Sequence, residues 1–222
     1  MIDYILSIIA DGSTYYLLFN IVYYVTSLIL FLVDYYRLFI DSKVNETNEA
    51  ADMMATYKKT IPNVVFNTSI ALILPAILIA ISKYGDEREF SYQRCAFDIL
   101  ISILLLDIFF YMLHRLFHIP ALYKRFHKKH HEILSPVGFS SLYMTITDFY
   151  FGNLLPGYLP MFIVGAHPIT IKIWIVMAIL NTILLAHSGY WVANYHDKHH
   201  SLFNKNYGAN IFMDKLLGTY SV

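Results

Sequence analysis

The chain contains almost no cysteine and little charge. Its single cysteine, Cys95, excludes an intrachain disulfide and a metal cluster built on thiolates. Charged residues make up only 14% of the 222 residues and the formal net charge is zero, so no global basic field attracts nucleic acid. We therefore expect no nucleic-acid partner, and a metal site in this chain has to use ligands other than sulfur.

Long apolar runs take the place of charge. Hydrophobic residues make up 57% of the chain, and a bilayer core accommodates about 20 apolar residues of helix. The candidate spans are residues 15–39, 63–83, 96–113, 142–165 and 169–186. The fourth contains Gly152, Pro156, Gly157 and Pro160, so we expect it to be broken or kinked. The sequence thus predicts an all-α integral membrane bundle with four to five spans.

Nine of the ten histidines fall into two short stretches, and each stretch follows one of these runs. The first holds His114, His118, His127, His130 and His131, and the second holds His187, His196, His199 and His200. The spacing His-x-x-His-His occurs once in each stretch. Residues three and four apart share a face of a helix, so each of these boxes can aim two or three imidazoles at one point.

This number of histidines suits two metal ions with four or five ligands each. Imidazole is a ready ligand for zinc, iron, copper and nickel, and the lack of cysteine favours an all-nitrogen shell. A lipid-headgroup patch is the alternative for the basic run 127–131, but the second box and the additional His187 favour metal binding. The tenth histidine, His167, lies apart from the boxes, and we expect an ordinary surface or hydrogen-bonded residue there.

The positions of Lys and Arg predict which way the spans run. Only residues 166–168 separate the last two spans, so these form a hairpin and both histidine stretches lie on one side. On this topology twelve of the 16 Lys and Arg residues share the histidine side, and four, Lys83, Arg88, Arg94 and Lys172, lie opposite. The positive-inside rule then places the histidines in a helical cap on the cytoplasmic side and the N-terminus outside or in a lumen.

The histidine strings resemble those of a known superfamily. DIFFYMLHRLFH at 107–118 and HKKHH at 127–131 resemble the first two boxes of the fatty acid hydroxylase and sterol desaturase superfamily. HSGY at 187–190 and HDKHH at 196–200 resemble the last two boxes of its sterol C4-methyl oxidase branch, and NYG at 206–208 with MDKLLGT at 213–219 resembles the tail. We therefore expect one membrane domain, 1–222, with N-terminal spans and a linker at 1–95 and a catalytic region at 96–220.

Members of that superfamily are membrane-bound, non-haem di-iron oxygenases. The resemblance implies that all nine histidines ligate two iron ions, that O2 is the oxidant, and that electrons come from a separate donor such as cytochrome b5 and its reductase. It implies hydroxylation or oxidation of a C–H bond in a sterol or fatty acyl lipid and, in a eukaryotic cell, residence in the endoplasmic reticulum. We expect zinc in some purified samples, because imidazole sites bind it well.

Two other functions remain open. A lipid desaturase would use the same di-iron site and remove a second hydrogen. A non-enzymatic metal-binding membrane protein, such as a transporter, would place its ligands at mid-membrane in broken helices, whereas the boxes here lie just past the ends of the spans.

Two carboxylates are candidate partners for the ligand imidazoles. Asp107 lies seven residues, or about two helical turns, before His114 and thus on nearly the same face. An intramembrane Asp is costly unless it is paired, so we expect Asp107 to orient a ligand imidazole, with a pairing to a neighbouring helix as the alternative. Asp148 is a second candidate, and it ends the string Thr145–Asp148, which stands where many members of the superfamily have His-Pro-x-Glu.

The predicted orientation has a direct test at Asn45. The string Asn45-Glu46-Thr47 is a glycosylation sequon, and the topology puts it in the cytoplasmic loop between the first two spans. We expect Asn45 to stay unmodified in a eukaryotic host, so that endoglycosidase treatment leaves the mobility of the protein on a gel unchanged. Glycan on Asn45 would invert the topology and move the histidines to the lumenal side.

Overall fold

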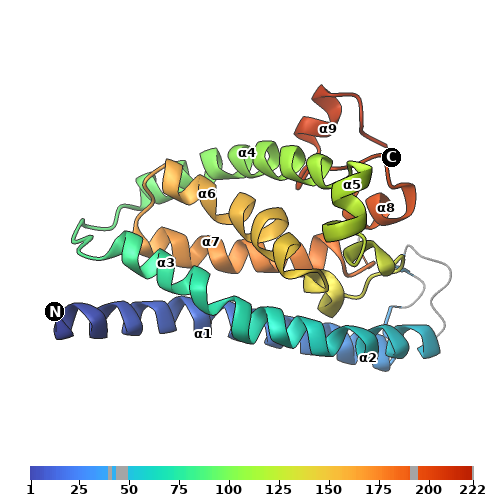
Figure 1. Cartoon of the computed structure of the whole chain (residues 1–222), viewed down its shortest axis with the longest axis horizontal. Coiled ribbons are helices and arrows are strands. Elements are labelled where there is room, and N and C mark those ends of the chain that lie inside the picture. Colours follow the sequence, from blue (N-terminus) through green and yellow to red (C-terminus); the bar gives the residue numbers. More distant parts are fainter. Residues whose placement is uncertain (40–41, 44–49, 191–194, 222) are drawn as a thin grey trace.

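Every regular element in the described part of the chain is a helix (Figure 1). The computed structural model describes residues 1–39, 42–43, 50–190 and 195–221, so Asn45 lies outside the described residues. Four helices are long and apolar enough to cross a membrane: Ile2–Tyr35, Met53–Lys83, Tyr92–Phe117 and Pro168–Ala186. The prediction of an all-α membrane bundle is confirmed.

The first span, α1 (Ile2–Tyr35), is longer than the sequence suggested. The expected start at residue 15 was wrong, because the small and polar residues before it do not end the helix. The Thr14 hydroxyl donates to the carbonyl oxygen four residues earlier at 3.0 Å. Gly12 is buried where a Cβ would lie 3.6 Å from the backbone of α3 (Ile73–Lys83). A small residue at this point lets the two helices approach closely.

The second span consists of α2 (Ala50–Phe66), a π-helical turn (Asn67–Ala71) and α3. Its first helix begins at Ala50, well before the predicted start of the span at residue 63. The π-helical turn ends four residues before Pro75, whose missing N–H and bulky ring interrupt regular helical hydrogen bonding. A wider helical turn thus precedes this proline.

The third span, α4 (Tyr92–Phe117), delivers the first histidines to one end of the bundle. Ser91 caps its N-terminus, since the Ser91 side chain accepts the Arg94 N–H at 3.3 Å. The short α5 (Pro120–Leu122) follows and turns the chain back. The second histidine group then lies on a π-helical turn (Tyr123–His127) and a 3-10 turn (His130–Glu132).

The segment expected to be a broken span is interrupted, as its Gly and Pro residues suggested. A 3-10 turn (Gly138–Leu142) ends where the predicted span begins. The span itself contains a π-helical turn (Asp148–Leu154) and α6 (Leu155–Ile163), and it is not among the four helices of the described residues that are long and apolar enough to cross.

The last span returns the chain to the histidine end of the bundle. It is α7 (Pro168–Leu180) with a π-helical extension (Asn181–Ala186). Its N-cap is His167, whose Nδ1 accepts the Ile169 N–H at 3.1 Å and whose other ring nitrogen donates to the Arg88 carbonyl oxygen at 3.0 Å. His167 is therefore a hydrogen-bonded residue outside the boxes, as expected.

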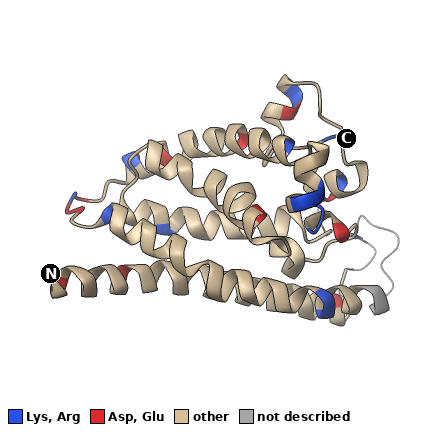
Figure 2. Cartoon of the chain, viewed as in Figure 1, with Lys and Arg blue, Asp and Glu red and all other residues tan. Residues whose placement is uncertain are grey.

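The helices run lengthwise between two polar ends. Helix α1 packs along α3 and α7, and α4 packs along α6 (Figure 1). The N-terminus, the loop after α3 and the α6–α7 turn lie at one end, and both histidine stretches lie at the other, as the hairpin between the last two spans required. Lys, Arg, Asp and Glu gather near the two ends (Figure 2). Two short helices, α8 (Tyr195–Leu202) and α9 (Phe212–Leu216), complete the histidine end.

The buried side chain of Asp34 connects α1 with three other segments near the histidine end: those that carry Lys43, Tyr57 and Tyr190. Asp34, near the end of α1, is only 1% exposed. Its two oxygens accept hydrogen bonds from the hydroxyls of Tyr57 and Tyr190, each at 2.7 Å, and Lys43 lies 2.8 Å away. These contacts satisfy the buried charge and fix the chain three residues after His187.

Candidate metal centre

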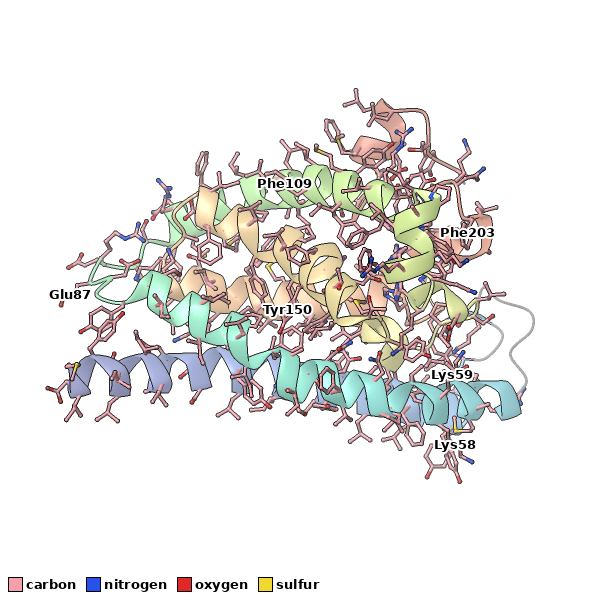
Figure 3. All side chains as sticks on the ribbon, in the orientation of Figure 1. Lys58, Lys59, Glu87, Phe109, Tyr150 and Phe203 are labelled. Atoms are coloured by element: carbon pink, nitrogen blue, oxygen red, sulfur yellow. The ribbon has the colours of Figure 1, made fainter. Side chains whose placement is uncertain are left out.

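The structure brings all nine predicted histidines together at one end of the bundle, the end that carries the Phe203 label in Figure 3. Their candidate ligand nitrogens form two groups, and within each group these atoms lie within 4.8 Å of one another. The five-histidine group comprises His114, His118, His127, His131 and His199; the four-histidine group comprises His130, His187, His196 and His200. The groups adjoin, since the ring centroids of His131 and His200 are 4.7 Å apart.

Each His-x-x-His-His box serves both groups. The first box gives its outer pair, His127 and His131, to the five-histidine group, and the second gives its outer pair, His196 and His200, to the four-histidine group. The middle histidine of each box, His130 or His199, joins the opposite group. The second box lies on α8, and at about 100° per residue positions i and i+4 of an α-helix differ by about 40°, while i+3 points about 60° to the other side. The second box therefore aims two imidazoles at one point and the third at another. The first box, on a π-helical turn and a 3-10 turn, divides its imidazoles in the same way.

Hydrogen bonds fix the outer nitrogen, Nδ1, of several histidine rings, which points away from the centre of its group. Four Nδ1 atoms lie 2.6–3.2 Å from backbone carbonyl oxygens: His114 from Tyr207, His130 from Tyr143, His187 from Thr182 and His199 from Lys205. A carbonyl oxygen can only accept, so each of these Nδ1 atoms carries the proton and each Nε2 presents a lone pair to its group. This is the tautomer and the ring direction that a metal ligand needs.

The inner nitrogens face one another at the spacing of ligands around a metal ion. The Nε2 of His114 lies 3.0 Å from the Nε2 of His127, and the Nε2 of His199 lies 3.0 Å from that of His118 and 3.2 Å from that of His131. Nitrogens bound to one metal ion at about 2.1 Å lie about 3.0–3.4 Å apart. Facing lone pairs repel each other unless a cation lies between them, so the residues present fit a metal ion.

Burial keeps these rings neutral. Burial, with a smaller contribution from the neighbouring imidazoles, lowers the pKa of His118 and of His130 to about 3. Burial also lowers the pKa of His200 well below its usual value, and neither nitrogen of that ring has a hydrogen-bond partner among the described residues. At neutral pH protons therefore do not fill the space between the rings, and a metal ion is the cation that suits it.

Asp148, rather than Asp107, pairs with a ligand imidazole. The Nδ1–H of His127 donates to Asp148 at 2.7 Å, and both side chains are almost fully buried. The two oxygens of Asp107 instead accept the backbone N–H groups of Asn210 at 2.6 Å and Met213 at 2.8 Å. The expectation that Asp107 orients an imidazole is thus corrected. This carboxylate holds the tail of the chain against α4. Its role is close to the alternative, in which Asp107 pairs with a neighbouring helix.

A second buried carboxylate, Asp214, lies in the tail itself and was not identified from the sequence. It accepts the N–H of Tyr207 at 3.0 Å and of Gly208 at 2.6 Å, and it accepts the hydroxyl of Tyr195. Asp214 thereby holds the backbone whose Tyr207 carbonyl receives the proton of His114. One signal was available, because Asp214 is the only acidic residue after Asp197 and lies in an otherwise apolar stretch.

A cavity of about 230 Å³ opens onto both histidine groups. Its walls come from α4, from the segment between Asp148 and Gly157, from α7 with its extension, and from residues 208–210. His114 and His127 of one group and His130, His187 and His196 of the other reach this cavity. Away from the histidines the lining is mainly apolar and includes Leu106, Trp174 and Met177. A lipid chain placed there would bring one of its carbons to the histidines.

Comparison with known proteins agrees with these motifs. The model of the fatty acid hydroxylase family matches residues 99–219. The chain is 36% identical over 182 residues to fatty acid hydroxylase domain-containing protein 2 of Homo sapiens, covering 78% of this chain and 54% of that protein. It is 32% identical over 146 residues to methylsterol monooxygenase 2-2 of Arabidopsis thaliana, covering 58% and 54%.

A third relative matches over a longer stretch at lower identity. Sphinganine C4-monooxygenase 2 of Arabidopsis thaliana is 25% identical over 209 residues, covering 85% of this chain and 78% of that protein. The chain spans about half the length of the first curated relatives that it matches. No solved structure matches it.

Removal of the Asp148 carboxylate should weaken metal binding. Asp148→Ala leaves the Nδ1–H of His127 without an acceptor, and loss of such a partner lowers metal affinity by roughly 10–100-fold. Metal content after dialysis against graded chelator measures the effect. Asp98→Ala is the matched control, because Asp98 is a buried carboxylate on α4 that pairs with Arg94 at 2.7 Å, away from the histidines. Equal metal retention by Asp148→Ala and wild type would contradict the prediction.

A side chain at position 208 should disturb the tail. In Gly208→Ala the new Cβ would collide with the Asn210 carbonyl oxygen and lie 2.6 Å from Asp107 Oδ1. Overpacking of this kind costs about 1–3 kcal/mol, and thermal unfolding in detergent measures it. Gly157→Ala is the control, since its Cβ would meet nothing within 4 Å. A Gly208→Ala protein as stable as the control would show that the tail adjusts freely.

Proposed function

The chain belongs to the fatty acid hydroxylase family, and we propose that it is a membrane-bound oxygenase that uses two iron ions, O2 and external electrons to hydroxylate or oxidise a lipid C–H bond. The observation that carries the proposal is the cavity, which has a mainly apolar wall and opens onto both groups of inward-facing imidazoles. Relatives named as sphinganine and methylsterol monooxygenases support an oxygenase acting on a lipid.

Two iron ions held by the nine histidines would supply the activation of O2 that oxidation of an unactivated C–H bond requires. The residues of the chain would hold the metal ions and orient the imidazoles and the lipid. Backbone carbonyls and Asp148 fix the imidazole tautomers, and the buried walls exclude water from the reacting carbon. The ring of Phe203 lies 4.7 Å from that of His131 and 5.4 Å from that of His118, so it covers the five-histidine group.

Position in the membrane suits the supply of both reactants. The cavity lies among helices that are long and apolar enough to cross a bilayer, so a sterol or fatty acyl substrate reaches it from the lipid phase. The histidine groups lie at a charged end of the bundle, where a separate donor such as cytochrome b5 with its reductase would deliver electrons (Figure 2). We infer that this end faces the cytoplasm, in the endoplasmic reticulum of a eukaryotic cell.

The cavity favours an enzyme over a metal transporter or store. A transporter binds its ion near the bilayer midplane in discontinuous helices. Here the histidines follow the ends of α4 and α7 and adjoin a space that suits an apolar molecule. A desaturase would use the same groups and the same cavity, and its product distinguishes it: a desaturase removes two hydrogens from the lipid, whereas a hydroxylase adds one oxygen atom.

The proposal is tested by the lipids and the metals of matched variants. We expect cells that contain the protein to accumulate an oxidised lipid when O2 is present, and purified protein to hold two metal ions per chain. His130→Ala and His199→Ala, one from each group, should abolish the product because each removes a ligand. His167→Ala is the control, since the tenth histidine lies outside both groups. Mass spectrometry of the lipids and metal analysis of the protein give the two readouts.

Two outcomes would overturn the proposal. Near-normal product in His130→Ala or His199→Ala would show that these groups do not act on the substrate. One metal ion or none in well-folded wild-type protein would reject the nine-ligand centre.

A further inference from the structure

The side chains of three asparagines in the cavity wall, Asn153, Asn181 and Asn210, have no hydrogen-bond partner in the described part of the protein, and two of them, Asn153 and Asn181, lie in helical segments. Asn153 lies in the π-helical turn before α6, and Asn181 begins the extension of α7. Both line the cavity, and so does Thr182, whose hydroxyl also bonds to no described residue. Donors and acceptors are therefore left free within a mainly apolar wall.

Asparagines elsewhere in the transmembrane helices are used inside the protein. The Asn20 side chain donates to the Thr68 carbonyl oxygen at 3.3 Å, and Asn63 accepts the Met144 N–H at 2.9 Å. Asn67 donates to the carbonyl oxygens of the 142–144 segment at 2.9 and 3.2 Å. A carboxamide without a partner is costly among apolar groups, so Asn153 and Asn181 mark a place where a bound molecule supplies the hydrogen bonds.

Their position relative to the histidines limits what that molecule is. Asn153 is five residues beyond Asp148, and Asn181 is six residues before His187. Both segments are π-helical, with i→i+5 hydrogen bonds, so each interval is about one turn, and both asparagines lie about one turn along their helices from the histidine end. A lipid with its reacting carbon at the histidines would therefore have a different part of its skeleton beside the asparagines.

The charge of the cavity limits the molecule further. No Lys or Arg is among the described residues that line it, and Asp148 is its one carboxylate. Beside the asparagines, away from the histidines, a carboxylate or phosphate group would have no Lys or Arg as a counter-charge, which is strongly unfavourable in an apolar site. The Trp174 N–H is already used, because it donates to the Gly157 carbonyl oxygen at 2.7 Å. The polar part of the lipid has to be uncharged.

We propose that this cavity selects a lipid with an uncharged hydrogen-bonding group, a hydroxyl, ketone or amide, which Asn153 and Asn181 bind while a carbon several atoms away reaches the histidines. The inference rests on the proposed function and narrows its substrate class. An unsubstituted hydrocarbon segment would leave both carboxamides unsatisfied.

The test compares the binding of probes that differ in one group. Metal-loaded protein in detergent is equilibrated with tritiated 1-hexadecanol or hexadecane, and the bound label is counted after rapid gel filtration. A hydrogen bond between uncharged groups changes affinity by roughly 2- to 10-fold. We expect the alcohol to bind more tightly than the alkane by this factor. Equal binding of alcohol and alkane by the wild-type protein overturns the proposal, whatever the variants do.

Variants then locate the preference. The double variant Asn153→Leu/Asn181→Leu removes both carboxamides and should bind the alcohol and the alkane equally. Asn20→Leu, which changes a transmembrane asparagine outside the cavity, should keep the preference of the wild type. Metal content and gel-filtration profile establish that each variant is folded. A double variant that keeps the full preference would overturn the role of the two asparagines.

Binding is measured without O2 or electrons, so the two proposals fail separately. Protein that prefers the alcohol but oxidises no lipid would reject the oxygenase and leave the binding preference standing. Protein that oxidises a lipid but binds alcohol and alkane equally would reject this inference alone.

Discussion

The facing lone pairs of the imidazoles are the constraint on which the rest of the histidine end depends. Unprotonated nitrogens 3.0–3.2 Å apart repel one another. The surrounding chain therefore has to hold the rings in place until a cation binds between them. The backbone carbonyls of Tyr207, Tyr143, Thr182 and Lys205 do this by accepting the outer ring protons. The tail after α8 is folded back over α4 because His114 needs one of these carbonyls. Asp107 and Asp214 are buried where they are because that tail needs acceptors for its own N–H groups.

Much of this arrangement was predictable, because membrane spans and histidine boxes are local patterns. Apolar length identified α4 and α7, and the three-residue turn between the last two spans put both histidine stretches at one end. Local patterns fail where a distant contact decides. Gly12 and Thr14 look like the end of a helix, yet α1 continues because α3 packs against the glycine and the threonine hydroxyl bonds within the helix. Asp107 lies on nearly the face of α4 that its spacing predicted. Its oxygens, however, accept hydrogen bonds from a segment about 100 residues later in the chain instead of from an imidazole.

Most of the groups that orient the imidazoles belong to the backbone, and no residue type reveals them. Any side chain at position 143, 182, 205 or 207 would offer the same carbonyl oxygen, so the sequence shows the candidate ligands but not the groups that orient them. Asp148 is the exception, because its carboxylate is a side chain and can be seen in the sequence. The fatty acid hydroxylase family is thus recognised by its histidines, while the geometry that makes them ligands resides in how the chain turns between the boxes.

Division of each box between the two groups makes the pair of sites a single unit. His127 and His131 cannot turn without moving His130, and His196 and His200 cannot turn without moving His199, because each set is carried on one short helical stretch. Each stretch therefore links both groups. In contrast, α4 contributes only to the five-histidine group, and the end of α7 contributes only to the four-histidine group. The cavity reaches histidines of both groups from the side of α4 and α7, where the two sites adjoin. A box with spacings of three and four residues therefore contributes imidazoles to two adjacent groups at once, and both boxes of this chain do so.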